Sequence, residues 1–132
     1  MKLIPLILLF TLTTLLYAEI IVVTNKNSDI NNLTKQSIKY LYLAKVNKIN
    51  DIRIKPFLSK DKKLHERFIN NIIDKDIEQY SSYWARLVFT GREAIPRRLS
   101  FKEIKQKLNE KNTIIYIDKK DMNKNWKIIY GK

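Results

Sequence analysis

The sequence contains no cysteine, only one histidine and only two glycines among 132 residues. The absence of cysteine excludes a disulfide framework, a thiolate metal site and a cysteine nucleophile. The single imidazole, His65, excludes a histidine-rich metal cluster, and two isolated glycines exclude the loops that cradle nucleotide phosphates. No two carboxylates form a convincing acid–base pair. The sequence therefore predicts a protein that is not an enzyme and that has no cofactor and no metal.

Acidic side chains are also scarce, with 13 Asp and Glu against 26 Lys and Arg, which gives a net charge of +13. Such a charge attracts anionic partners of many kinds. Lysine greatly outnumbers arginine, however, whereas recognition of phosphates and bases usually employs the arginine fork. We therefore expect no specific nucleic-acid partner. A basic protein that binds nucleic acid or an anionic surface through its net charge is the alternative function.

A long apolar run occurs only at the N-terminus. Met1-Lys2 precedes the apolar residues 3–16, and Tyr17-Ala18 precede the polar Glu19. The run is shorter than the roughly 20 apolar residues of a transmembrane helix. It predicts a signal peptide over residues 1–18, a periplasmic or secreted protein, and no stable membrane insertion after cleavage. An uncleaved N-terminal anchor is the alternative.

The remaining residues, 19–132, alternate between strand and helix patterns, with no linker or repeat. The β-branched run 20–23 predicts a buried strand, and residues 52–57 alternate as a strand with one polar face. Residue spacing and capping residues predict helices over 34–45, from Ser59 or Asp61 to Asp74, from Asp76 to about Thr90, and after Ser100. Two β-rich runs, 113–117 and 126–130, end the chain. This order predicts one α/β domain.

The apolar side chains of the predicted helices indicate where the core lies. Tyr80 and Trp84 share one face of the third helix with Leu87 and Val88, and we expect Trp84 to be a core residue. Phe101 begins a similar apolar stripe on the fourth helix, together with Ile104 and Leu108.

Several segments resemble the substrate-binding proteins of phosphate ABC transporters. Trp84 and the later Phe89-Thr90-Gly91-Arg92 are similar to the family's W-x-x-x-x-F-T-G-[KR] pattern, and Pro96 follows at the corresponding distance. The segment 40–45 resembles an IFLGK-like motif, and residues 114–117 resemble the family's G-x-I-G-Y strand.

The resemblance implies a single-lobe periplasmic-binding-protein-like (type II) α/β domain with a mixed β-sheet and flanking helices. It also implies an exported solute-binding-like protein whose ligand is a small oxyanion such as phosphate, or an accessory factor with a protein partner in the periplasm. The sequence departs from the family at Ala44, which replaces a glycine, and in the segment 57–63, which replaces an R-x-x-S-G-T motif. The resemblance therefore implies the fold more strongly than the ligand.

Six residues are candidates for binding an anion, at loops where a strand or helix ends: Ser28, Ser59, Lys60, Thr90, Arg97 and Arg98. Ser59 and Lys60 precede a predicted helix, whose free N–H groups suit an oxyanion. Hydroxyl donors from Ser28 and Thr90 come from other loops, and the adjacent arginines offer bidentate donors. Asp61 opposes this prediction, because its carboxylate would fill the same position. Capping, turn and solvated surface roles are the alternatives at every one of these positions.

Overall fold

The structure is a computed structural model that describes residues 19–131; the predicted signal peptide lies outside the described residues. The elements follow the predicted order with short additions: β1 (Ile20–Asn25), α1 (Lys35–Tyr42), β2 (Lys48–Ile49), β3 (Ile52–Arg53), β4 (Lys55–Pro56), β5 (Leu58–Ser59), α2 (Lys62–Phe68), the π-helix η1 (Ile69–Ile73), α3 (Ile77–Phe89), β6 (Arg98–Leu99), α4 (Phe101–Lys107), β7 (Thr113–Asp118), the 3-10 helix η2 (Lys119–Asp121) and β8 (Trp126–Tyr130).

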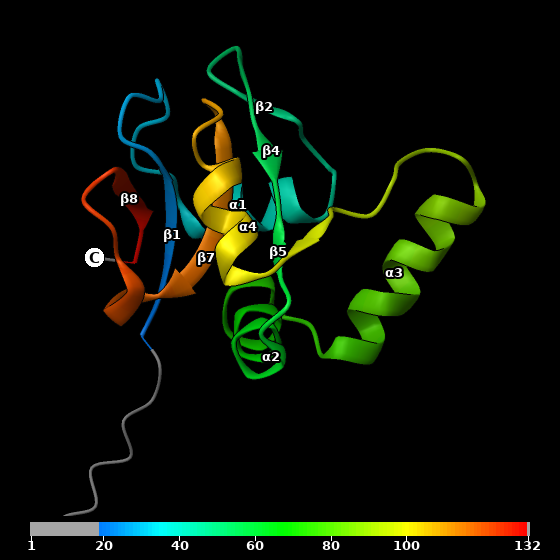
Figure 1. Cartoon of the computed structure of the whole chain (residues 1–132). Helices are drawn as coiled ribbons and strands as arrows, with labels where there is room; N and C mark the ends of the chain where they lie inside the picture. Colours follow the sequence, from blue (N-terminus) through cyan, green and yellow to red (C-terminus); the bar gives the residue numbers. More distant parts are fainter. Residues whose placement is uncertain (1–18, 132) are drawn as a thin grey trace, which may run out of the picture.

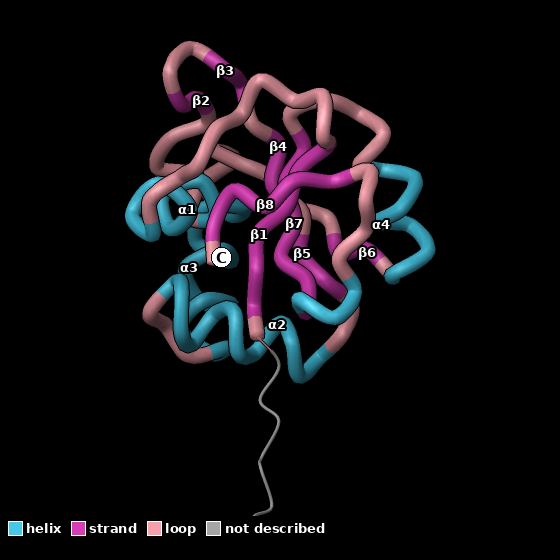
Figure 2. The backbone as a smooth tube through the Cα atoms, turned by 90° about the vertical axis from the view of Figure 1, so that its left-hand side faces the viewer, coloured by secondary structure: helices cyan, strands magenta, loops and turns pink. Residues whose placement is uncertain are grey.

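A mixed four-stranded sheet with the order β4-β7-β1-β8 lies at the centre of the fold (Figures 1 and 2). β1 pairs antiparallel with both β7 and β8, whereas β4 pairs parallel with β7. Two small sheets, β2-β3 and β5-β6, extend one edge. The predicted fold class, a mixed sheet with flanking helices, is confirmed.

The two faces of the sheet carry separate apolar clusters, because successive side chains of a strand point to opposite sides. Val22, Ile114 and Tyr116 pack on one face with residues of α1, α2, η1 and α3. The opposite face is covered by α4 and by Trp126, which pack against alternate residues of the same strands. The sheet is therefore the middle layer of three, and its continuous β-branched runs reflect burial on both faces.

The helix starts are set by local capping. Thr34, Asp61, Asp76 and Ser100 each accept a hydrogen bond from a backbone N–H of the first turn. Asp76 and Ser100 form full capping boxes with Gln79 and Glu103. These caps satisfy donors that a helix end leaves without partners, and they confirm the predicted helix starts.

The single strand predicted over 52–57 is wrong in detail. Asn50 and Asp51 adopt left-handed conformations with φ of 50° and 64°, so β3 turns back to pair with β2. β4 joins the main sheet, and β5 instead pairs in parallel with β6, which the sequence pattern did not indicate. Pro56, which has no N–H to donate, lies at the end of β4 and at the edge of the main sheet.

Burial along α3 differs from the predicted apolar face. Tyr80 and Trp84 are buried as expected, but Val88 is 48% exposed and Phe89 is 92% exposed. Figure 1 shows the C-terminal end of α3 extending away from the sheet, so no other element covers it. Phe101, the first residue of α4, is likewise 45% exposed, because only Ile104 and the following Leu108 reach the core. Within residues 19–131, no helix combines the length and apolarity that crossing a membrane requires.

Candidate functional site

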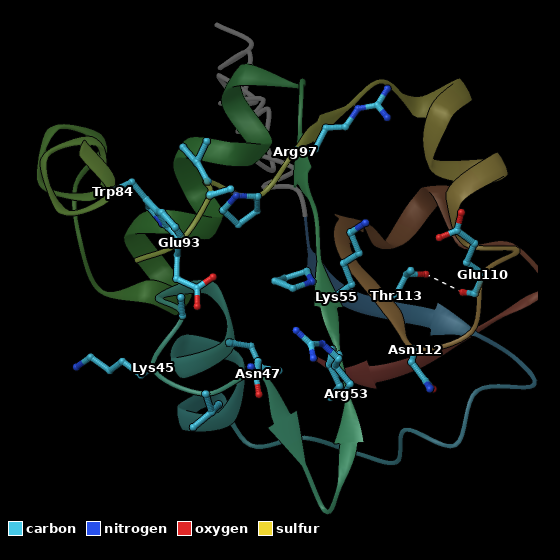
Figure 3. Close-up of a pocket in the computed structure, with 18 of the residues that line it drawn as sticks. Lys45, Asn47, Arg53, Lys55, Trp84, Glu93, Arg97, Glu110, Asn112 and Thr113 are labelled. Carbon is cyan, nitrogen blue, oxygen red and sulfur yellow. Dashed lines mark hydrogen bonds between the residues drawn. The ribbon is translucent and has the colours of Figure 1, made fainter. Parts of the chain in front are cut away.

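A cleft of about 800 Å³ opens beside the edge of the sheet at β4 (Figure 3). Four parts of the chain form it: the end of α1 with the turn that follows, the strands β3 and β4, the loop between α3 and β6, and the residues just before β7. Its polar lining includes Lys45, Asn47, Arg53, Lys55, Glu93, Arg97, Glu110, Lys111, Asn112 and Thr113. Apolar side chains supply the rest, including Ile54, Pro56, Trp84, Ile95 and Pro96.

Positive charge predominates in the cleft. Lys45, Arg53, Lys55 and Lys111 are exposed, and among the described residues none has a carboxylate within ion-pair distance. The ammonium group of Lys55 lies 5.4 Å from the centroid of the Phe57 ring, on the same strand segment. Cations without partners in a concave surface concentrate their field and attract anions.

Two carboxylates also line the cleft, and they differ in their surroundings. Glu110 forms an ion pair of 3.4 Å with Lys107, which offsets its charge. Figure 3 shows Glu93 on the same side of the cleft as Trp84 and Lys45, across from Lys55. The side of the cleft near Glu93 is therefore less favourable to an anion than the side near Asn112.

The structure places Ser59, one of the predicted anion ligands, in a buried hydrogen-bond network at the end of β5. Its backbone N–H donates to the Tyr116 hydroxyl (2.8 Å), and its Oγ accepts from the Asp61 N–H (3.0 Å). Its carbonyl accepts from Nε of Arg98 (3.1 Å). The Asp61 carboxylate in turn accepts from the Leu64 N–H (3.2 Å). Ser59 and the Asp61 carboxylate thus have their partners within the protein.

Lys60 and Arg97, two further predicted ligands, converge on the Glu103 carboxylate. Lys60 Nζ lies 3.1 Å from Oε1, and Arg97 Nη2 lies 2.8 Å from Oε2. The Ser100 N–H also donates to Oε1 (3.1 Å). The hydrogen bond from Ser100, followed by that from Lys60, lowers the pKa of Glu103 to about 2. The protein's own carboxylate therefore occupies the place where these cations would hold an external anion.

The remaining two predicted ligands lie elsewhere. Ser28 donates to Oδ1 of Asn112 (2.9 Å) and accepts from the Ile30 N–H (3.2 Å), near the beginning of β7. Thr90 donates to the carbonyls of Arg86 and Leu87 at the end of its own helix. The structure thus brings Ser59, Lys60, Arg97 and Arg98 together, and it does not bring Ser28 or Thr90 to them.

Sequence reasoning missed a buried pair beside Ser59. His65 is 7% exposed, and its Nδ1 lies 2.5 Å from the Tyr116 hydroxyl. Burial, and secondarily the charge of Arg98, lowers the pKa of His65 to about 4, so that its ring is neutral at pH 7. Burial also raises the pKa of Tyr116, so its hydroxyl keeps its proton at pH 7 and can donate a hydrogen bond to Nδ1 of the neutral His65 ring.

The cleft cations Arg53 and Lys55 were also missed as site residues, although the pattern had placed both on the polar face of a strand. No group of three or more metal-ligating side chains occurs in the part of the chain that the structure describes.

Comparison with known proteins supports the fold. No known family profile matches the sequence, and no curated protein matches it significantly. Among solved structures, one similar chain is a Clostridium perfringens protein assigned as a phosphate ABC transporter substrate-binding protein, with bound phosphate. The TM-score is 0.62, with 21% identity over 84% of this chain and 44% of that one. An ABC-type phosphate transport receptor from Vibrio cholerae gives a TM-score of 0.54 and 14% identity, over 84% of this chain and 45% of that one.

The sheet order, the helices on both faces and these likenesses define the class: the chain has the periplasmic-binding-protein-like α/β fold. More particularly, it is similar in fold to the substrate-binding proteins of phosphate ABC transporters, which confirms the resemblance noted in the sequence. The chain spans less than half the length of the two structures that it matches.

Proposed function

We propose that this chain is an exported, non-enzymatic binding protein that takes a small oxyanion, such as phosphate, in the cleft beside β4. The observation that carries the proposal is the presence there of Arg53 and Lys55, two cations on either side of Ile54 that have no carboxylate partners among the described residues. The fold supports it, because both similar structures are named for phosphate transport. On this proposal, the side chains of the cleft bind the oxyanion without any additional group.

The position of these cations suits an anion physically. Both belong to short strands at the sheet edge, and their side chains reach the middle of the cleft in Figure 3. A guanidinium supplies paired donors, and an ammonium adds a compact charge. Because the two cations lie in a concave surface, water and salt screen their charges less there than on a flat surface.

Four of the six residues predicted from sequence, Ser59, Lys60, Arg97 and Arg98, define a second location for the anion. An anion there would have to displace the Glu103 carboxylate from Lys60 and Arg97. In the cleft, Arg53 and Lys55 have no such competitor. The cleft is therefore the site that we favour, and the two locations are separable by mutation.

Replacing both Arg53 and Lys55 with alanine is expected to abolish the rise in melting temperature that millimolar phosphate produces. A ligand that binds only the folded state raises the midpoint by an amount that grows with the logarithm of its concentration relative to Kd, so loss of the site removes the shift. Both side chains are exposed, so the melting temperature without phosphate should change little. Differential scanning fluorimetry of both proteins, with and without phosphate, makes the measurement.

The matched control is Lys26→Ala with Lys124→Ala, which removes the same charge from exposed positions outside the cleft. This control should keep the phosphate shift. A shift that survives in the Arg53/Lys55 variant and disappears in Ser59→Ala/Lys60→Ala would place the anion at the α2 start instead. No shift in the unmodified protein, together with salt-dependent binding of duplex DNA, would favour the alternative function through net charge.

Export is the second part of the proposal. When the whole chain is expressed in a Gram-negative host, the periplasmic fraction should contain a protein whose N-terminal sequence begins at Glu19. A variant with Leu8→Arg and Leu9→Arg interrupts the apolar run and should remain in the cytoplasm at full length. Edman sequencing of the periplasmic material would contradict the proposal if it found Met1.

A further inference from the structure

The cleft is larger than a single inorganic oxyanion requires. Its volume of about 800 Å³ falls within the range of roughly 300–1,000 Å³ in which proteins bury organic molecules. An anion held by Arg53 and Lys55 would leave most of this volume to water. The size of the cleft therefore points to a ligand with a body beyond one anionic group.

The cations of the cleft extend to both sides of this central pair. Lys45 follows α1, and Lys111 precedes β7 next to Asn112. Figure 3 shows Lys45 and Asn112 on opposite sides of Lys55. The ammonium group of Lys45 lies 5.2 Å from the centroid of the Tyr40 ring, so Lys111 is the flanking cation that is available to a second anionic group.

The two sides are not equivalent. On the side of Lys45, the Glu93 carboxylate has no ion-pair partner among the described residues and repels an anion. On the side of Lys111, the charge of Glu110 is offset by Lys107 at 3.4 Å. Asn112 there accepts a hydrogen bond through Oδ1 from Ser28, and Figure 3 shows its side chain turned away from Lys55. The second anionic group is therefore favoured on the side of Lys111.

The apolar residues that line the cleft indicate the chemistry of the ligand's body. Pro56 of β4 and the loop residues Ile95 and Pro96 line the same cleft, and Ile95 is 52% exposed. The side chains of this isoleucine and the two prolines offer contact surface but no hydrogen-bond donors. Such a lining suits carbon more than the oxygens of a continuous phosphate chain.

We propose that the preferred ligand of the cleft is an organic dianion, with two phosphate or carboxylate groups held apart by a carbon body. One group is bound by Arg53 and Lys55 and the other by Lys111. This inference rests on the proposed function, because it assigns the first group to the same two cations. It adds Lys111 as a binding residue and sets the class of ligand.

Isothermal titration calorimetry with three probes tests the inference: orthophosphate, pyrophosphate and fructose 1,6-bisphosphate. The bisphosphate should bind at least about tenfold more tightly than orthophosphate, because its second group binds at high effective concentration. Pyrophosphate, whose two groups are adjacent, should resemble orthophosphate. Lys111→Ala should weaken bisphosphate binding about fivefold, as expected for loss of one partly exposed ion pair, and should change orthophosphate binding less than about twofold. Lys26→Ala, outside the cleft, is the control and should change neither.

Each outcome separates this inference from the function on which it rests. If orthophosphate binds and the bisphosphate binds no more tightly, the organic dianion is wrong and the oxyanion function stands. If pyrophosphate binds most tightly, the separation by a carbon body is wrong. If Lys111→Ala weakens both ligands equally, Lys111 does not bind a second group. If no probe binds the unmodified protein, the proposed function and this inference fail together.

Discussion

Replacing Trp84 with alanine is expected to lower the free energy of unfolding by about 3–5 kcal/mol, which is the range for loss of a large buried aromatic side chain. Trp84 is only 2% exposed, and its ring makes edge contacts with Tyr80 and Tyr83, with centroids 6.5 Å and 6.2 Å away. The deletion therefore leaves a cavity between α3 and the rest of the first apolar cluster. Chemical denaturation followed by circular dichroism measures the loss.

Trp84 also joins α3 to α1 through hydrogen bonds at the end of α1. Its Nε1–H donates to the Tyr42 carbonyl (3.3 Å), which also accepts from the Tyr80 hydroxyl (3.1 Å). The Tyr83 hydroxyl donates to the next carbonyl, that of Leu43 (2.5 Å). Aromatic side chains of α3 thus satisfy carbonyls that the end of a helix leaves without partners. These aromatic side chains in the middle of α3 therefore hold it against the end of α1.

Phe89→Ala is the matched control, because it removes another aromatic ring from α3. Phe89 is 92% exposed, so its loss should change the free energy of unfolding by less than about 0.5 kcal/mol. Equal effects at Trp84 and Phe89 would contradict the packing of α3 described above. A large effect at Trp84 confined to α3, seen by hydrogen exchange as local opening, would still agree with it.

The sequence predicted well those features that depend on neighbouring residues. Helix starts at Thr34, Asp76 and Ser100 depend on side chains that bond within one turn, and these residues are visible in the sequence. The strands β1 and β7 are β-branched runs buried on both faces, which gives them an equally local signal.

Features that depend on distant partners were not predictable. The division of residues 52–59 among β3, β4 and β5 depends on three different partner strands, β2, β7 and β6. The exposure of Val88 depends on how far α3 extends beyond α1, which no spacing within α3 encodes.

The candidate site also combines features that neighbouring residues determine with contacts that depend on distant parts of the chain. The sequence indicated that Lys60 and Arg97 are basic, but not that Glu103 lies between them. In a chain with 26 basic residues, nothing local distinguishes Arg53 and Lys55 from the others. They stand out only because the fold leaves them without carboxylates in a cleft. The helix that contains His65 was predictable from the sequence. Its partner Tyr116 was not, because Tyr116 lies on a strand and 51 positions later in the chain.

The burial of His65 against Tyr116 leads to a large pH effect. The free energy of unfolding should fall as the pH is lowered from about 7.5 to 5. The pKa of His65 is lowered from 6.5 to about 4, chiefly by burial, so the unfolded chain takes up a proton in this window that the folded protein does not. Because the unfolded state binds more protons, the free energy of unfolding decreases as the pH falls through 6.5 and levels off below about 4. Without solvent screening, the free energy of unfolding would fall by about 2 kcal/mol over this window. Solvent screening reduces the expected loss to about 1–2 kcal/mol.

The assignment of this effect is unusually direct, because the chain has one histidine and no cysteine, and carboxyl groups titrate mostly below pH 5. His65→Gln should therefore remove most of the slope between pH 7.5 and 5. The side-chain oxygen of the introduced glutamine can still accept the hydrogen bond that Tyr116 donates. Urea unfolding of both proteins at pH 7.5, 6.0 and 5.0 compares them, and the variant should lose less than about 0.5 kcal/mol over this range. A slope of equal size in the variant would show that His65 does not take up the proton.

Proton uptake by His65 would turn Nδ1 from an acceptor into a donor facing the Tyr116 hydroxyl, which already accepts from the Ser59 N–H. Acid therefore weakens the junction of α2, β5 and β7 first, at the opposite end of β7 from Asn112.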